Sequence, residues 1–235
     1  MPWLISANHL ADKIWKDRVL EAAYWLNKWD RGEIGFHQSD FNHLMVRHFS
    51  AFGLDVGAHV FVPLCGKTRD IAWLLQQGFR VTGCELSRDA VEALYADLSL
   101  TPMVTQDGGL IRYATPDLVV FVGDIFDVSA RALGNVQAVY DRAALVALPA
   151  EVRARYANHV AVITDHAPQL IVTFTYDPSK MSGPPFSVTS DMIADLFGRD
   201  YDLNLMETCE VASGLKRGLV AATESAWRLM PRAAK

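Results

Sequence analysis

The sequence places a glycine and an acid where a nucleotide-binding fold needs them. Gly66 closes a turn after the apolar run Val60–Val62, and Glu85 ends a second apolar run 19 positions later. Glycine lets the backbone turn tightly and lets a ligand approach it closely. In dinucleotide-type sites, an acid about 20 residues after the glycine motif hydrogen-bonds the ribose hydroxyls. The pair therefore predicts a nucleoside-binding site at this turn.

A phosphate-binding loop is one interpretation, because the tripeptide GKT at 66–68 matches the end of GxxxxGK[ST]. That motif needs a glycine five positions before the final one, where this chain has Phe61 inside an apolar run. Leu64 and Cys65 also leave too few flexible positions to wrap a phosphate. An NTPase or kinase is therefore disfavoured.

A nicotinamide or flavin site is a second interpretation, and it needs GxGxxG. With Gly66 as the first glycine, positions 68 and 71 must be glycine; with Gly66 as the second, positions 64 and 69 must be. None of the four is glycine, so close pyrophosphate packing is not provided for. S-adenosylmethionine carries an adenosine but no phosphate, and one glycine with one ribose acid can serve it. The residues favour this third interpretation.

Two further strand ends supply side chains of the right kind. Asp124 and Ile125 follow the third apolar run of the predicted sheet, and Arg142 follows the fourth. Ligands of open α/β sheets bind at the carboxyl ends of strands, so we expect these residues near the glycine and the acid. Asp124 suits the adenine amino group, with helix capping as the alternative, and Ile125 suits packing on the ring. Arg142 suits an anionic substrate, with pairing to a neighbouring carboxylate as the alternative.

Trp25 and Trp29 stand four positions apart and share one face of a predicted helix. They serve either as core anchors or as a cover over the ligand. The second interpretation rests on chemistry, because flat aromatic rings beside a glycine-containing turn make a good lid.

The sequence offers no metal-binding motif. His43 and His48 stand five positions apart and lack the HExxH spacing, so we predict structural or surface roles for both. The cysteines Cys65, Cys84 and Cys209 form no CxxC pair. Their odd number suits a reduced compartment better than a disulfide framework.

Strands and helices alternate along the chain, which is typical of an α/β fold. Strands are predicted at 60–62, up to 85, at 118–122, 136–140, 170–176, 201–211 and 218–227, with a hairpin or excursion at 100–116; helices are predicted at 8–29, 39–52, 88–98, 149–164 and 189–196. No Ser/Gly-rich linker divides the chain. Residues 1–235 are therefore expected to form one domain, with 1–38 as a helical segment that covers the cofactor.

The composition limits the partners. The chain has 235 residues, of which 51% are hydrophobic, a net charge of −5 and a pI of about 5.8. A nucleic-acid binder usually shows a basic excess, so nucleic acid is not expected. No stretch reaches the roughly 18 apolar residues of a membrane span, and the N-terminus lacks a signal-peptide pattern. We expect a soluble cytoplasmic protein that acts as a monomer.

Five segments together resemble the thiopurine S-methyltransferase family, in particular its bacterial branch: WLNKWDRGEIGFHQ, FVPLCGKTRDIAWLLQQGFRVTGCELS, GDIFDV, VYDRAALVALP and TYDPSKMSGPPFSV. They keep the family's order from Trp25 to Val188, and the match weakens after Ser190. The resemblance implies a Rossmann-like class I methyltransferase: an α/β fold with a seven-stranded, mostly parallel sheet, an antiparallel last strand and helices on both faces.

The resemblance also implies which residues meet S-adenosylmethionine: Trp25, Trp29, Leu64, Gly66, Glu85, Asp124, Ile125 and Arg142. Phe36 matches a family position beside the substrate. Asp124 stands where family members vary, so the resemblance specifies its location better than the role of its side chain.

The implied reaction is an in-line methyl transfer to the sulfur of an aromatic or heterocyclic thiol. Positioning supplies most of what a protein can give such a reaction. Aromatic thiols ionise near neutral pH, which fits a sequence without an obvious Cys–His or Ser–His–Asp set. We expect Arg142 to be the catalytic residue that orients the anionic sulfur, and Trp29 and Phe36 to exclude water. Selenium, tellurium, halide or thiocyanate acceptors stay open, as does a catalytically idle domain that only binds S-adenosylmethionine.

Overall fold

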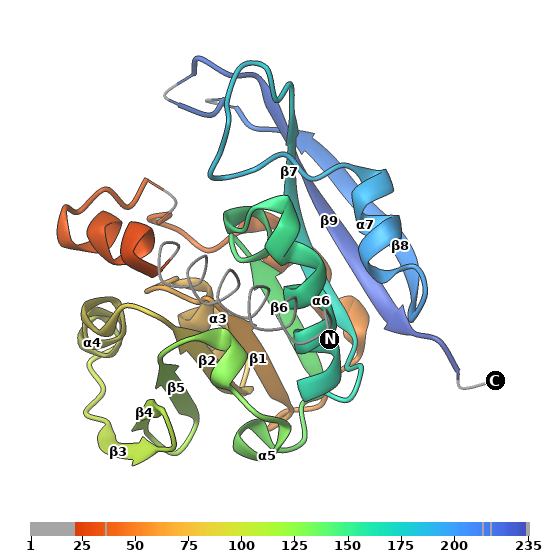
Figure 1. Ribbon diagram of the computed structural model, residues 1–235. Coiled ribbons are helices and arrows are strands. Elements are labelled where there is room, and N and C mark those ends of the chain that lie inside the picture. Colours follow the sequence, from red (N-terminus) through yellow and green to blue (C-terminus); the bar gives the residue numbers. More distant parts are fainter. Residues whose placement is uncertain (1–21, 36, 213, 217, 234–235) are drawn as a thin grey trace, which may run out of the picture.

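A single twisted sheet forms the centre of the molecule, with helices on both sides (Figure 1). The computed structural model describes residues 22–35, 37–212, 214–216 and 218–233. In these residues the sheet has nine strands in the order β3-β4-β5-β2-β1-β6-β7-β9-β8. The strands are β1 (His59–Pro63), β2 (Arg80–Glu85), β3 (Met103–Asp107), β4 (Leu110–Ala114), β5 (Leu118–Val122), β6 (Ala138–Arg142), β7 (Gln169–Tyr176), β8 (Tyr201–Glu210) and β9 (Ala222–Pro231).

The α/β class and the antiparallel last strand are confirmed. Strands β5, β2, β1, β6 and β7 pair in parallel, and β9 inserts antiparallel between β7 and β8. The count of seven strands is wrong. The expected hairpin at 100–116 forms β3 and β4, and β4 pairs antiparallel with β5, which extends the sheet to nine.

The connecting segments are helical. They are α2 (His43–His48), α3 (Asp70–Gln76), α4 (Arg88–Asp97), α5 (Ala130–Leu133), α6 (Ala150–Ile163) and α7 (Ser190–Phe197), with short 3₁₀ turns η1 (Phe49–Phe52), η2 (Ile125–Asp127) and η3 (Leu145–Ala147). The predicted helix at 39–52 starts later, because Asn42 caps α2 by accepting a hydrogen bond from the Met45 amide. Ser87 caps α4 in the same way, as its position before that helix suggests. Residues 22–30 are also helical.

The central strands bury both of their faces, because successive side chains of a strand point to opposite sides. On β1, Phe61 joins a core cluster with residues of α5, α6 and α7, whereas Val60 and Val62 join a second cluster with residues of α2, α3 and α4. This two-sided burial fixes the sheet rigidly and leaves its strand ends as the accessible edge. Among the described residues, no helix combines the length and hydrophobicity that a membrane crossing requires.

Candidate functional site

A cavity of about 680 Å³ lies at the carboxyl ends of β1, β2, β5 and β6. These four strands run in parallel, so the residues that end them meet at one edge of the sheet. The described residues expected from the sequence all line this cavity: Trp25, Trp29, Leu64, Gly66, Glu85, Asp124, Ile125 and Arg142.

The turn after β1 has a backbone conformation that few side chains tolerate. Leu64 has a φ of 47° and Gly66 a φ of 51°. The left-handed conformation is strained for a residue such as Leu64, and strain of this kind gathers at ligand sites. The turn is fastened to β2, because the Cys65 amide donates to the Cys84 carbonyl oxygen at 2.9 Å.

Glu85 is the buried acid of the cavity, with 7% of its surface exposed. Its two carboxylate oxygens accept hydrogen bonds from the Gly66 and Ser87 amides, each at 2.8 Å. Burial raises the pKa of this carboxyl group, and the backbone hydrogen bonds oppose that rise. Each carboxylate oxygen has a further lone pair, so Glu85 orients the glycine turn and can still accept from ligand hydroxyls.

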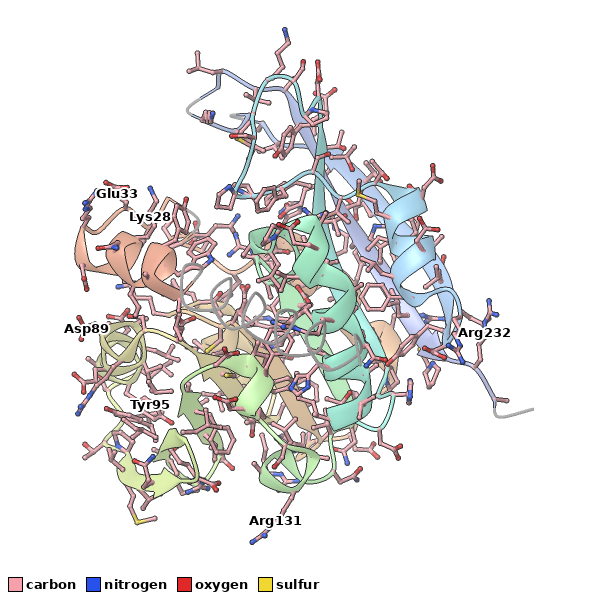
Figure 2. The ribbon with its side chains drawn as sticks, viewed as in Figure 1. Lys28, Glu33, Asp89, Tyr95, Arg131 and Arg232 are labelled. Carbon is pink, nitrogen blue, oxygen red and sulfur yellow. The ribbon has the colours of Figure 1, made fainter. Side chains whose placement is uncertain are left out.

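The helical segment 22–30 forms one wall of the cavity. A Cβ atom on Gly66 would lie 3.0 Å from Cζ2 of Trp29, so this indole ring already lies against the glycine turn. Lys28 of this helix and Glu33, which follows it, form an ion pair, and Figure 2 shows them together at the outer end of this segment. The residues 1–21 and Phe36 lie outside the described residues, although the neighbours Gly35 and His37 line the cavity.

Asp124 has the capping role that the sequence offered as an alternative. Its Oδ1 accepts from the Phe126 amide at 2.9 Å, at the start of η2. The carbonyl oxygen of Ile125 lies 2.8 Å from Nε2 of His159, a residue of α6. The Asp124–Ile125 pair is therefore held at the cavity by its own turn and by α6.

Arg142 is the last residue of β6, two positions beyond the end of the apolar run. Its neighbour Asp141 is buried, and its carboxylate accepts from the Leu145 amide at 2.9 Å and from the Tyr156 hydroxyl at 2.7 Å. Burial raises the pKa of Asp141 from its ordinary 3.8 to about 6. Because adjacent strand residues point to opposite faces, anchoring Asp141 inside the core directs Arg142 towards the cavity.

A second group of lining residues comes from parts of the chain whose sequence patterns were less informative. Phe174, Met181, Pro184 and Pro185 line the cavity from the end of β7 and the loop that follows. The Pro/Gly-rich composition marked this loop. It is held in place because the Tyr176 hydroxyl donates to the Pro185 carbonyl oxygen at 2.6 Å.

Glu224 also lines the cavity, and nothing in the sequence around it indicates a site. It is a strand residue of β9, 5% exposed, and burial raises the pKa of its carboxyl group, while the nearby Arg142 charge opposes that rise. Only the sheet pairing of β7 with β9 brings it to this edge.

Solved structures with low sequence identity share this fold. The Burkholderia thailandensis 1,6-didemethyltoxoflavin-N1-methyltransferase, solved with 1,6-didemethyltoxoflavin and S-adenosylhomocysteine bound, has a TM-score of 0.63 at 14% identity and covers 92% of this chain and 89% of its own. The N-terminal domain of EvdMO1, solved with S-adenosylhomocysteine bound, has a TM-score of 0.57 at 10% identity. It covers 84% of this chain and 83% of its own.

Comparisons of sequence, in contrast to those of structure, identify the family. The family model for Thiopurine S-methyltransferase (TPMT) matches residues 20–232. The thiopurine S-methyltransferase of Xanthobacter autotrophicus is 50% identical over 211 residues, which are 89% of this chain and 99% of that protein. That of Gluconobacter oxydans is 44% identical over 215 residues, 92% and 97% of the two chains. The chain therefore belongs to the thiopurine S-methyltransferase family, and it is a methyltransferase with S-adenosylmethionine as its methyl donor.

Proposed function

We propose that this enzyme transfers the methyl group to the sulfur of small aromatic or heterocyclic thiols, the thiopurine type. One observation carries the proposal: Arg142 ends β6 in a cavity that also holds the buried acid Glu85 and a wall of apolar side chains. A planar guanidinium attracts an anionic sulfur, and the apolar wall suits an aromatic ring.

The donor belongs at the β1–β2 half of the cavity in this proposal. Glu85 accepts from the ribose hydroxyls, and the turn at Leu64 and Gly66 lets the donor approach the backbone. Asp124 and Ile125 hold the adenine. Bound there, S-adenosylmethionine supplies a methyl group on a positively charged sulfur, and the anionic carboxylate of Glu85 suits a cationic ligand.

The acceptor belongs between Arg142 and the loop that carries Met181 and Pro184. Arg142 orients the thiolate so that its sulfur, the methyl carbon and the departing sulfur lie on one line. The new carbon–sulfur bond forms as the old one breaks, and the departing sulfur keeps the electron pair. Trp29 and Phe36 exclude water. No general base is needed, because the thiolate is the nucleophile and aromatic thiols ionise near neutral pH.

We further propose that residues 1–235 form one methyltransferase domain whose segment 1–38 covers the cofactor, acting as a cytoplasmic monomer on small molecules. Trp25 and Trp29 in the cavity wall support the covering role, and the net charge of −5 argues against nucleic acid.

An acceptor panel tests the proposal. Transfer of a labelled methyl group is measured with 6-mercaptopurine, thiophenol, selenite, tellurite, iodide and thiocyanate. The proposal expects the two thiols to have the largest kcat/KM. Preference for a metalloid oxyanion or an inorganic anion would replace the thiol assignment, and binding of S-adenosylhomocysteine without any transfer would indicate an idle domain.

A further inference from the structure

Three side chains of metal-ligand type meet beside the cavity. His43 is the first residue of α2, Cys209 belongs to β8 and Glu224 to β9. Their ligand atoms, an imidazole nitrogen, the thiol sulfur and a carboxylate oxygen, all lie within 4.8 Å of one another. The Cys209 sulfur lies 3.4 Å from Nε2 of His43.

The secondary structure fixes this arrangement. Cys209 and Glu224 stand directly opposite each other in the β8–β9 register, so both side chains emerge on the same face. The start of α2 is tied to the same place, because Asn42 donates from its side-chain amide to Glu224 at 3.3 Å and from its backbone amide to Asp70 at 2.7 Å. The three donors are therefore held in position by two strands and a capped helix end.

Glu224 gives this cluster a reason to bind a cation. It is a carboxylate with 5% exposure. Within the described residues, the hydrogen bond given to its side chain comes from a neutral amide at 3.3 Å, a long contact. Buried charges are normally paired or coordinate metals. The charge of Arg142 acts on Glu224, and the same carboxylate lies within 4.8 Å of the imidazole nitrogen and the thiol sulfur.

We propose that His43 Nε2, Cys209 Sγ and the Glu224 carboxylate bind one divalent cation of the zinc class. Thiolate and imidazole donors select zinc-like ions, whereas magnesium and calcium prefer oxygen ligands alone. Three protein ligands leave one position of a tetrahedral ion for water, and His43 is exposed, so that position opens to solvent. Binding displaces the thiol proton of Cys209, which is released to solvent.

The sequence could not indicate this site, because its ligands are separated by 166 positions between His43 and Cys209. His43 and His48 fail as a local motif, and the structure separates their roles. His48 lies 2.7 Å from Glu207 and takes no part in the cluster. It provides a matched control on the same helix.

The test titrates reduced, chelator-stripped full-length protein with Co²⁺, whose bond to a thiolate gives a charge-transfer absorption band, and then displaces it with Zn²⁺ against a chromophoric chelator. We expect one equivalent per chain and a thiolate band. Cys209→Ser removes the band. His43→Asn weakens Zn²⁺ binding by at least about 10-fold, since even outer-shell partners of a metal ligand contribute 10–100-fold. His48→Asn leaves both unchanged.

Cys209 is half-buried, so Cys209→Ser could misfold, whereas His43 is exposed and its variant keeps the test valid in that case. Circular dichroism without metal checks the folding of each protein. A band that survives in a folded Cys209→Ser protein overturns the proposal. So does a Zn²⁺ affinity in His43→Asn equal to that of the wild type, because the thiol–imidazole contact is then only a hydrogen bond.

Discussion

At the scale of single residues, two acids that line the cavity, Glu85 and Asp124, and the neighbouring Asp141 hold the backbone in place. Glu85 accepts from the amides of Gly66 and Ser87, Asp124 caps η2, and Asp141 accepts from the Leu145 amide. Each carboxylate fixes the turn that follows a strand. The shape of the cavity edge and the local fold therefore depend on the same side chains.

Glu85→Gln tests this double role. The amide keeps the size of the side chain but turns its NH₂ group towards one of the two backbone donors. We expect affinity for S-adenosylhomocysteine and the free energy of unfolding each to fall by about 1–3 kcal/mol, the cost of a buried polar group left unsatisfied. Calorimetry and urea unfolding measure the two effects, with the exposed Glu151→Gln as the control. Unchanged affinity would reject the ribose role of Glu85.

Asp141 predicts a pH dependence of stability. Its folded pKa of about 6 exceeds its ordinary 3.8, so the fold favours the neutral carboxyl group. Its stabilising contribution is complete below pH about 4 and is lost as the pH rises through 6, a change of up to about 3 kcal/mol. Asp141→Asn removes the titration, so the free energy of unfolding of the wild type should fall relative to that of the variant as the pH rises over this range. Urea unfolding at pH 4 to 7 measures it, and parallel curves would contradict the assignment.

The locations of these residues could be predicted from the sequence, but their backbone roles could not. Apolar runs mark where strands end, and ligands bind at strand ends, so Gly66, Glu85 and Arg142 were identifiable. Glu85 meets the Gly66 amide only once β1 and β2 have paired, so that contact has no local signal. Glu224 also has no local signal in the sequence, because the β7–β9 pairing brings it to the site.

At the scale of elements, the β1 turn and the helical segment 22–30 form one unit. The Trp29 ring lies against the position where a Gly66 side chain would begin. The turn is therefore shaped both by a left-handed φ and by an aromatic neighbour. The sequence predicted the turn and the helix separately, but their contact is a matter of tertiary packing.

Gly66→Ala and Gly108→Ala separate the effect of the left-handed φ from that of the Trp29 contact. Both glycines have a positive φ, 51° and 59°, so either alanine should cost about 1–2 kcal/mol of stability. Only at Gly66 does the new Cβ approach Trp29, at 3.0 Å, whereas Gly108 has no atom within 4 Å. We expect Gly66→Ala alone to weaken binding of S-adenosylhomocysteine. Equal affinities in the two variants would show that the Trp29 contact is not part of the binding site.

At the scale of the whole molecule, both core clusters reach the cavity, because Val146 and Leu148 of one and Cys65 of the other line it. The β3–β4 hairpin that raises the strand count forms one edge of the sheet, and Leu110 of β4 packs against Gly123 of the cavity wall. Its place in the sheet could not be predicted from its own residues, because β3 is exposed and the hairpin is attached through β4, which pairs with β5 and whose Tyr113 packs into the core.

If the chain is a single domain, a ligand at the strand ends stabilises all of it. S-adenosylhomocysteine at 100 times its Kd should add about 2.7 kcal/mol and raise the unfolding midpoint by roughly 5–10 °C. Calorimetry should show a single transition that moves as a whole. Two transitions, of which only one responds to ligand, would contradict the single-domain proposal.

Single-turnover methyl transfer to thiophenol by Arg142 variants tests the central claim most directly. Arg142→Ala should lower the rate by about 100-fold or more, comparable to loss of an electrostatic group at a reacting atom. Arg142→Lys should not restore it fully, because the planar fork is lost. Arg131→Ala should match the wild type, because Arg131 is an exposed residue of α5 and is not among the residues that line the cavity. A wild-type rate in Arg142→Ala, with the donor bound, would contradict the account.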